Sequence, residues 1–134
     1  MILADYNAFC ANLPYATHVV QWGGAHVWKI GGKVFAVAGW IDDEFLAVTF
    51  KCSPLSFDLL KQRKGLRPAP YLAPRGMSWI QRHGKGDMSD ADLQDYLRES
   101  YRLASLNLSK RLQQELGLNR PSSGRSTVRR SKPT

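Results

Sequence analysis

Two runs of β-forming residues flank a pair of glycines in the first third of the chain, and this arrangement does most to limit the possible folds. Val27–Ile30 precedes Gly31 and Gly32, and Lys33–Ala38 follows them. Because glycine tolerates the positive φ angles of tight hairpin turns, we expect an antiparallel hairpin here. Strand follows strand with no helical segment between them, unlike the alternating strands and helices of a parallel sheet.

Periodic apolar residues on either side of this hairpin predict the other elements. Strands are expected at Val19–Trp22, at Phe45–Cys52 and at Ser78–His83. The segment Leu66–Leu72 is expected to be an extended edge or a loop against an edge, because Pro68 and Pro70 cannot both donate within a central strand. Helices are expected at Leu3–Leu13, from Ser53-Pro54 to Gly65, and from Ser89 to Gly117, the last either continuous or bent near Asn107.

This succession of elements predicts one α+β domain over residues 1–118, with a mostly antiparallel sheet and helices packed on one face. Alternation along Phe45–Cys52 indicates which side chains face the helices. Those predicted to point inward are Leu46, Val48, Phe50 and Cys52, and those predicted to point to a wetter face are Ala47, Thr49 and Lys51.

The formal net charge is +8, and it is unevenly distributed. Residues 119–134 carry five cations and no acidic residue, and we expect them to form a disordered basic tail. Positions 51–85 carry eight cations against one acidic residue, Asp58. A basic sector with a basic tail favours a polyanionic partner, although a solvated surface with a flexible terminus has the same composition.

Several classes of function find no support in the sequence. The longest apolar runs fall short of the ~20 residues of a membrane span, and Met1–Asn12 lacks the Lys or Arg of a targeting segment, so we expect a cytoplasmic protein. We also expect it to be a monomer.

Cys10 and Cys52 lie at apolar positions and are expected to be buried thiols. Three histidines (His18, His26 and His83) have no metal-ligand spacing, and no nucleophile is paired with a base. We therefore expect no enzyme, cofactor or metal.

Five segments, taken in order and at their spacing, resemble the MmcQ/YjbR family. They are Lys29–Ala36, Phe50–Pro54, Leu66–Leu72, Trp79 and Glu99–Leu103. The resemblance covers roughly residues 3 to 115. One departure lies between Tyr71 and Trp79, where the intervening loop is longer than the usual family spacing.

The resemblance implies a CyaY-like (frataxin-like) sandwich and a DNA-binding protein with a double-wing motif, meaning two β-hairpin wings. A frataxin-like fold also raises the question of iron binding, which in such carriers uses a ridge of carboxylates on the first helix. Here the first helix offers only Asp5, so the resemblance does not extend to metal chemistry.

The basic sector supplies the candidate residues for DNA binding. The cations expected to contact phosphates are Lys51, Lys61, Arg63, Lys64, Arg67, Arg75, Arg82 and Lys85. Tyr71 and Trp79 are candidates for stacking on bases, or else they pack on the sheet and fix the loop. The sequence offers no set of side chains for base readout, so we expect backbone-directed binding. Contact with ~4 to 6 phosphates would give a slope of about −4 to −5 in log affinity against log salt.

An alternative function rests on four tryptophans, Trp22, Trp28, Trp40 and Trp79. If several lie on one exposed face of the sheet, they would form a small-molecule pocket or a protein-interaction surface. If they fill the core between sheet and helices, they carry no such function. The salt dependence separates the two functions, because DNA binding falls steeply with salt whereas an aromatic interface persists.

Overall fold

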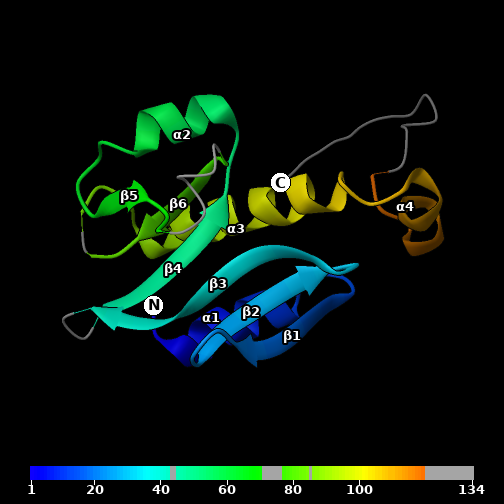
Figure 1. The fold of residues 1–134 in the computed structure, drawn as a ribbon, viewed down its shortest axis with the longest axis horizontal. Coiled ribbons are helices and arrows are strands. Elements are labelled where there is room, and N and C mark those ends of the chain that lie inside the picture. Colours follow the sequence, from blue (N-terminus) through cyan, green and yellow to red (C-terminus); the bar gives the residue numbers. More distant parts are fainter. Residues whose placement is uncertain (43–44, 71–76, 85, 120–134) are drawn as a thin grey trace.

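The computed structural model describes residues 1–42, 45–70, 77–84 and 86–119 (Figure 1). One six-stranded sheet has the order β1-β2-β3-β4-β6-β5, and every neighbouring pair of strands is antiparallel. The strands are β1 (Ala16–Gln21), β2 (Ala25–Ile30), β3 (Lys33–Asp42), β4 (Phe45–Lys51), β5 (Leu66–Pro68) and β6 (Trp79–Arg82). The helices are α1 (Leu3–Ala11), α2 (Pro54–Leu60), α3 (Asp90–Ser105) and α4 (Lys110–Leu116). No helix within the described ranges is long and apolar enough to span a membrane.

The hairpin predicted around Gly31 and Gly32 is confirmed as β2–β3. Both glycines have positive φ angles, 55° and 83°, and Ile30 pairs with Lys33 across the turn. The predicted edge segment is also present, because β5 ends at Pro68 and pairs only with β6. The α+β class with an antiparallel sheet is therefore as the sequence predicted.

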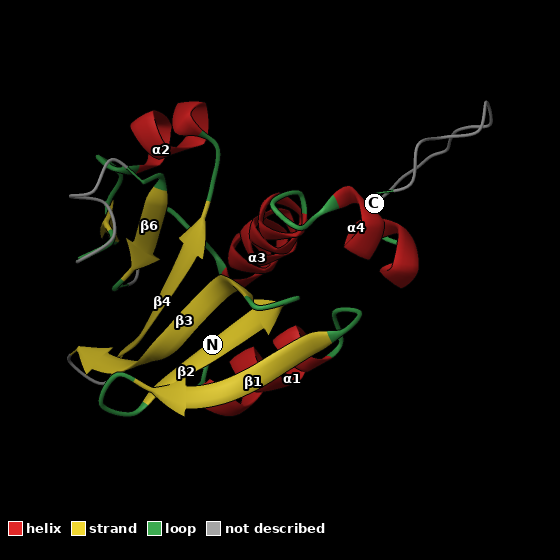
Figure 2. Cartoon of the chain, turned by 45° about the vertical axis from the view of Figure 1, so that its right-hand side comes forward, coloured by secondary structure: helices red, strands yellow, loops and turns green. Residues whose placement is uncertain are grey.

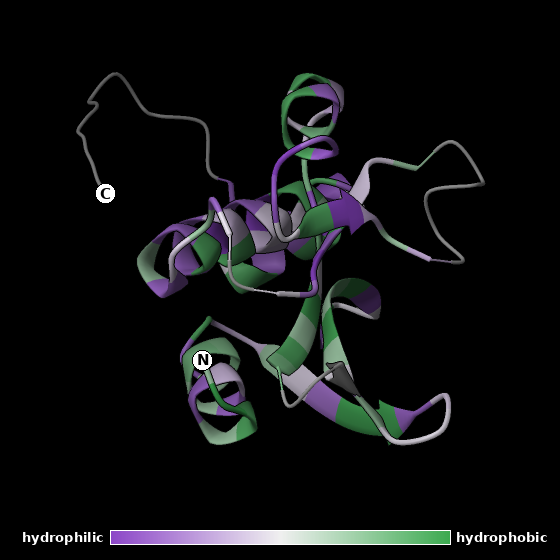
Figure 3. Ribbon diagram, turned by 90° about the vertical axis from the view of Figure 1, so that its left-hand side faces the viewer, coloured by the Kyte–Doolittle hydropathy of each residue, from purple (hydrophilic) through white to green (hydrophobic). Residues whose placement is uncertain are grey.

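The helices pack against one face of the sheet, as Figure 3 shows for α1 and α3. One core cluster joins the helices to the strands. It contains Tyr6 and Cys10 from α1, Leu60 from α2, Leu93 and Leu97 from α3, and Phe35, Phe50 and Ile80 from the sheet. The α3 ribbon alternates between hydrophobic and hydrophilic residues in Figure 3, as expected of a helix with one buried face.

The C-terminal helical segment is bent, so the second of the two predicted alternatives is correct. Ser89 caps α3 by accepting a hydrogen bond from Asp92 N (3.1 Å), and Ser109 caps α4 in the same way from Leu112 N (3.1 Å). Gly117, with φ 70°, ends α4 in the left-handed conformation. Figures 1 and 2 show α4 beyond the end of α3, on the far side of the molecule from α2.

The face of the sheet opposite the helices, which we call the open face, is drier than the sequence predicted. Cross-strand register places Val37, Thr49 and Gln81 side by side on this face. Thr49 and Ala47, expected to be wet, are each only 2% exposed. Both are short side chains on a central strand of the sheet.

Candidate nucleic-acid interface

Four cations lie within seven residues at the junction of α2 and β5. The chain leaves α2 at Lys61 and turns into the edge strand at Gly65, which has φ 82°. We call Lys61, Arg63, Lys64 and Arg67 the basic cluster. Lys61 is half-buried and the other three are exposed. The predicted helix and its glycine stop therefore bring together half of the cations that the sequence assigned to DNA.

The members of the basic cluster differ in how far their charge is already paired. Lys61 Nζ forms an ion pair with Asp58 Oδ1 (3.1 Å), and Arg67 Nε donates to Gln81 Oε1 (2.8 Å). Among the described residues, neither Arg63 nor Lys64 has an ion pair of its own. Arg63 and Lys64 are thus the two cations most available to an external anion.

The loop after β6 holds this junction in place. Asp87 N donates to Lys64 O (3.0 Å), and Lys64 N donates to Asp87 Oδ2 (3.3 Å). His83 N donates to Gly65 O (2.9 Å). The two segments approach so closely that a Cβ at Gly86 would overlap the backbone of Lys64. The backbone that carries Lys64 is therefore fixed by long-range contacts and not by α2 alone.

Arg82 does not lie on the predicted interface, because it is buried and only 3% exposed. Its guanidinium pairs with Asp90 Oδ1 through Nη2 (2.8 Å), donates to Met88 O through Nη1 (3.2 Å), and lies over the Phe45 ring (5.1 Å). These contacts join β6 to the start of α3. The charge of Arg82 is therefore used inside the fold, out of reach of a nucleic acid.

Asp90, the partner of Arg82, receives hydrogen bonds from two cations. The amino group of Met1 and the Arg82 side chain, in that order, hold the pKa of Asp90 below its ordinary value of 3.8. The ionised carboxylate therefore stabilises the fold fully above 3.8, and this contribution is lost as the pH falls through the folded-state pKa.

An Asp90→Asn variant should consequently be less stable than the wild type at neutral pH, and the difference should shrink in acid below 3.8. Urea unfolding of both chains at the two pH values measures this change. A difference independent of pH would show that the carboxylate charge at position 90 does not contribute to folding.

Trp79 is also buried, with 5% of its surface exposed, so it is not available to stack on a base. Its packing on the sheet agrees with the alternative prediction for this side chain. Its indole Nε1 is buried and has no hydrogen-bond partner within the described parts of the chain. Three further candidates, Tyr71, Arg75 and Lys85, lie outside the described residues.

Lys51 lies at the end of β4, away from the basic cluster in sequence and half-buried. Its backbone N donates to the Oγ of Ser100 (2.8 Å), and the same hydroxyl donates to Phe35 O (2.6 Å). Ser100 on α3 thus fixes the end of β4 and, with it, the root of the Lys51 side chain.

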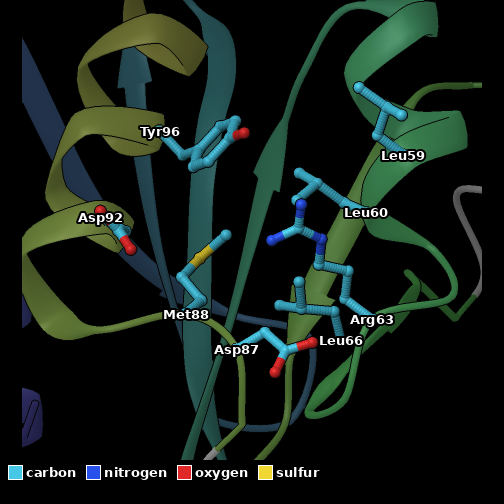
Figure 4. Close-up of a pocket in the computed structure, with 8 residues that line it drawn as sticks. All are labelled: Leu59, Leu60, Arg63, Leu66, Asp87, Met88, Asp92 and Tyr96. Atoms are coloured by element: carbon cyan, nitrogen blue, oxygen red, sulfur yellow. The ribbon is translucent and has the colours of Figure 1, made fainter.

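A pocket of about 250 Å³ separates α2 from α3 beside the basic cluster (Figure 4). Its lining is Leu59, Leu60, Arg63, Leu66, Asp87, Met88, Asp92 and Tyr96. The Arg63 guanidinium is directed into this pocket from the turn after α2, whereas Asp92 and Tyr96 lie on the opposite wall (Figure 4). The pocket therefore presents both signs of charge around an apolar floor.

A second pocket, of about 330 Å³, is lined both by open-face residues and by Ala104 and Asn107 at the end of α3, and we call it the open-face pocket. Its lining is Trp22, Lys33, Val34, Val37, Lys51, Met77, Trp79, Ala104 and Asn107. Two of the four tryptophans therefore line one pocket, although only Trp22 is exposed and Trp79 is buried, so they do not form the exposed aromatic face of the alternative prediction. Trp28 instead belongs to the helix-side core, and the side chain of Trp40 is outside the described set.

Of the charged and aromatic residues of the open-face pocket, Trp22 was predicted only under the alternative function, and Lys33 was not predicted as a site residue. Trp22 directly precedes Gly23 and Gly24, where a bulky aromatic residue is unexpected in a turn, and it is 58% exposed. An aromatic residue beside a glycine pair was the available signal. Lys33 gave no signal, because only the tertiary fold places it near Lys51.

The two cysteines are buried, as predicted, and two of the three histidines lie together on the first two strands. Burial raises the pKa of Cys10 to about 12 and that of Cys52 to about 11, so both thiols are protonated and enclosed, as expected of structural cysteines. His18 stacks on Trp28 (4.7 Å between ring centroids), and its Nε2 lies 2.9 Å from His26 Nδ1. Within the described ranges, no three His, Cys, Asp or Glu side chains gather as a metal site.

The fold and the basic cluster together define a small basic α+β domain, with one antiparallel sheet covered by helices on one face. This chain belongs to the YjbR family, whose model matches residues 11–103.

Two solved structures are similar in fold. Deinococcus radiodurans protein DR2400, which carries a DUF419 domain, aligns with a TM-score of 0.75 at 23% identity, covering 93% of this chain and 94% of that one. A Pseudomonas syringae protein aligns with a TM-score of 0.63 at 14% identity, covering 78% of this chain and 99% of that one. The comparison with curated proteins gave no match.

Proposed function

We propose that this protein is a non-enzymatic DNA-binding protein that contacts the phosphates of a duplex with little sequence preference. The observation that supports this best is the basic cluster at the α2–β5 junction, with exposed Arg63 and Lys64 free of ion pairs within the described chain. Exposed cations on a fixed backbone neutralise phosphates and release condensed counterions, which supplies affinity without base readout.

The acidic residues near the basic cluster offset only part of its charge. Asp58 is paired with Lys61, and Asp87 accepts a hydrogen bond from the backbone of Lys64. The Nη groups of Arg67 remain available, because its bond to Gln81 uses Nε. Arginine presents a planar fork that matches phosphate oxygens, so Arg63 and Arg67 are the expected anchors.

The hairpin tips are unequal as DNA-contacting wings. The sequence of the β3–β4 tip is acidic (Asp42, Asp43 and Glu44), which phosphates would repel, and the β1–β2 turn carries no charge. The β2–β3 hairpin carries Lys29 and Lys33 on either side of its glycines. The turn of this hairpin lies beside α4, because a Cβ at Gly31 would meet Leu108 and Leu112, and α4 is on the far side of the molecule from α2 (Figure 1). The proposed contact therefore rests on the basic cluster, and the β2–β3 hairpin is not part of the same surface.

Neutralising two cations of the basic cluster should weaken duplex binding more than neutralising any other pair. We expect Arg63→Gln/Lys64→Gln to lower duplex affinity at least about tenfold at low salt and to reduce the salt slope by about 2, since each lost phosphate contact removes about one unit. Fluorescence anisotropy of a labelled duplex, measured over a range of salt concentrations, gives both quantities.

The matched control is Lys110→Gln/Arg111→Gln, which removes the same charge from α4, on the far side of the molecule (Figure 1). An equal loss in the control would mean that net charge alone governs binding. A further full-length variant replaces the five tail cations with glutamine: Arg120, Arg125, Arg129, Arg130 and Lys132. If that variant alone abolishes binding, the tail carries the interaction and the basic cluster does not.

A further inference from the structure

Two features of Trp22, its backbone conformation and its exposure, do not stabilise the fold. Its backbone lies in the left-handed region (φ 53°), which is unfavourable for a bulky side chain by about 1 to 2 kcal/mol. Its side chain remains 58% exposed, so little burial offsets that strain. A glycine at position 22, like Gly23 and Gly24 after it, would adopt a positive φ angle without strain. An exposed indole held in this way is suited to contact a partner.

The ring of Trp22 forms one wall of the open-face pocket, and the apolar floor comes from β3. Val34 and Val37 lie on that floor, and Met77 borders it with 41% of its surface exposed. The volume of about 330 Å³ falls at the lower end of the range of small-ligand sites. A flat ring could therefore lie between the Trp22 indole and the apolar floor of the open face.

The polar groups of the open-face pocket are mainly hydrogen-bond donors. Lys33 and Lys51 supply two ammonium groups, and neither forms an ion pair with a described residue. Trp79 adds an indole Nε1 that is buried and has no acceptor within the described chain. The described lining contains no carboxylate, in contrast to the pocket between α2 and α3. The open-face pocket therefore selects a ligand with an anionic group and acceptor atoms.

We propose that the open-face pocket binds a single nucleotide. The base stacks on the Trp22 indole, the phosphate lies between Lys33 and Lys51, and an acceptor of the base or sugar meets the Trp79 indole N–H. A free mononucleotide and an unpaired nucleotide of a single strand share this chemistry. A paired base in a duplex does not, because its faces are already stacked.

This inference goes beyond the duplex contact proposed above and shares none of its anchors, Arg63, Lys64 and Arg67. It shares Lys51 with the basic sector predicted from sequence. The two proposals therefore fail separately: nucleotide binding should be unchanged in Arg63→Gln/Lys64→Gln, and duplex binding through the basic cluster does not need Trp22.

The test titrates the full-length chain with deoxythymidine monophosphate, with thymidine, with inorganic phosphate and with a short oligothymidylate at low salt. The indole N–H resonances in ¹H–¹⁵N spectra report binding. We expect the monophosphate to shift the Trp22 and Trp79 resonances, and to bind at least about tenfold more tightly than thymidine or phosphate alone, since ring and anion act together. Tighter binding of the oligothymidylate than of the monophosphate would identify a single strand as the source, and equal binding a free nucleotide.

Two pairs of variants locate the site. Trp22→Ala should weaken binding of the monophosphate at least about fivefold, whereas Trp22→Phe, which keeps a flat ring, should retain most of the affinity. Lys51→Gln should weaken it by a similar factor, with Lys64→Gln in the basic cluster as the charge-matched control. Lys51→Gln also decides the question if Trp22→Ala does not fold.

Three results would overturn the proposal. The first is no shift of either resonance by the monophosphate or the oligothymidylate. The second is binding of thymidine or phosphate as tight as that of the monophosphate. The third is monophosphate binding that is insensitive to both Trp22→Ala and Lys51→Gln, which would place the nucleotide elsewhere.

Discussion

An Arg82→Ala variant is expected to unfold with about 3 kcal/mol less free energy than the wild-type chain. The side chain is 3% exposed, and its guanidinium joins Asp90, the carbonyl of Met88 and the Phe45 ring across the junction of β6 and α3. Truncation removes the packed stem and leaves the Met88 carbonyl without its donor. Urea unfolding followed by circular dichroism measures the change.

Arg111→Ala is the matched control, because it makes the same substitution in an exposed ion pair. Arg111 Nε lies 3.2 Å from Glu115 Oε1 on α4, with 89% of the Arg111 side chain exposed, and its loss should change stability by no more than about 0.5 kcal/mol. Arg82→Met, which keeps the stem, should recover part of the loss. An Arg82→Ala effect as small as that of the control would return Arg82 to the list of interface candidates.

A Ser100→Ala variant is expected to be destabilised by about 2 to 4 kcal/mol, because one hydroxyl satisfies two buried backbone groups on different strands. Ser100 is fully buried, donates to Phe35 O (2.6 Å) on β3 and accepts from Lys51 N (2.8 Å) on β4. Alanine leaves both groups without a partner in the interior. Chemical unfolding gives the free-energy change, and amide hydrogen exchange at Lys51 reports the loss of its bond directly.

Ser105→Ala provides the comparison for this prediction. Ser105 is also buried, but its hydroxyl donates to Arg102 O one turn back on its own helix (2.7 Å). We expect a loss of no more than about 1 kcal/mol there, because the helical ladder does not need that bond. Equal effects of the two substitutions would mean that burial of the serine, and not its bridging of β3 and β4, sets its contribution.

Sequence periodicity predicted the elements well because their signals are local. Two glycines with positive φ angles define the β2–β3 hairpin, serine side chains cap α2 and α3, and Gly117 ends the last helix. Each of these depends on a few neighbouring residues, so the sequence predicts it without a tertiary structure. The family resemblance extended this to the whole fold.

The candidate site was predicted less completely. The basic cluster follows from four cations close together in the sequence, and it was found. Arg82 was assigned to the interface by its charge, although alternation along β6 places it on the same side of the strand as Ile80, which belongs to the core. A stricter use of the two-residue period would have identified it as an inward-facing cation that needed a buried partner.

The sequence by itself determined the order of the elements, the antiparallel sheet and the basic character of the α2–β5 junction, because hydrophobic period, turn chemistry and charge act over a few residues. Only the tertiary structure decided which charged and aromatic side chains reach solvent. Arg82 meets Asp90, and Trp22 shares a pocket with Trp79 and Lys51, through strand register and the placement of α3. Those contacts join residues far apart in the chain, and no local pattern specifies them.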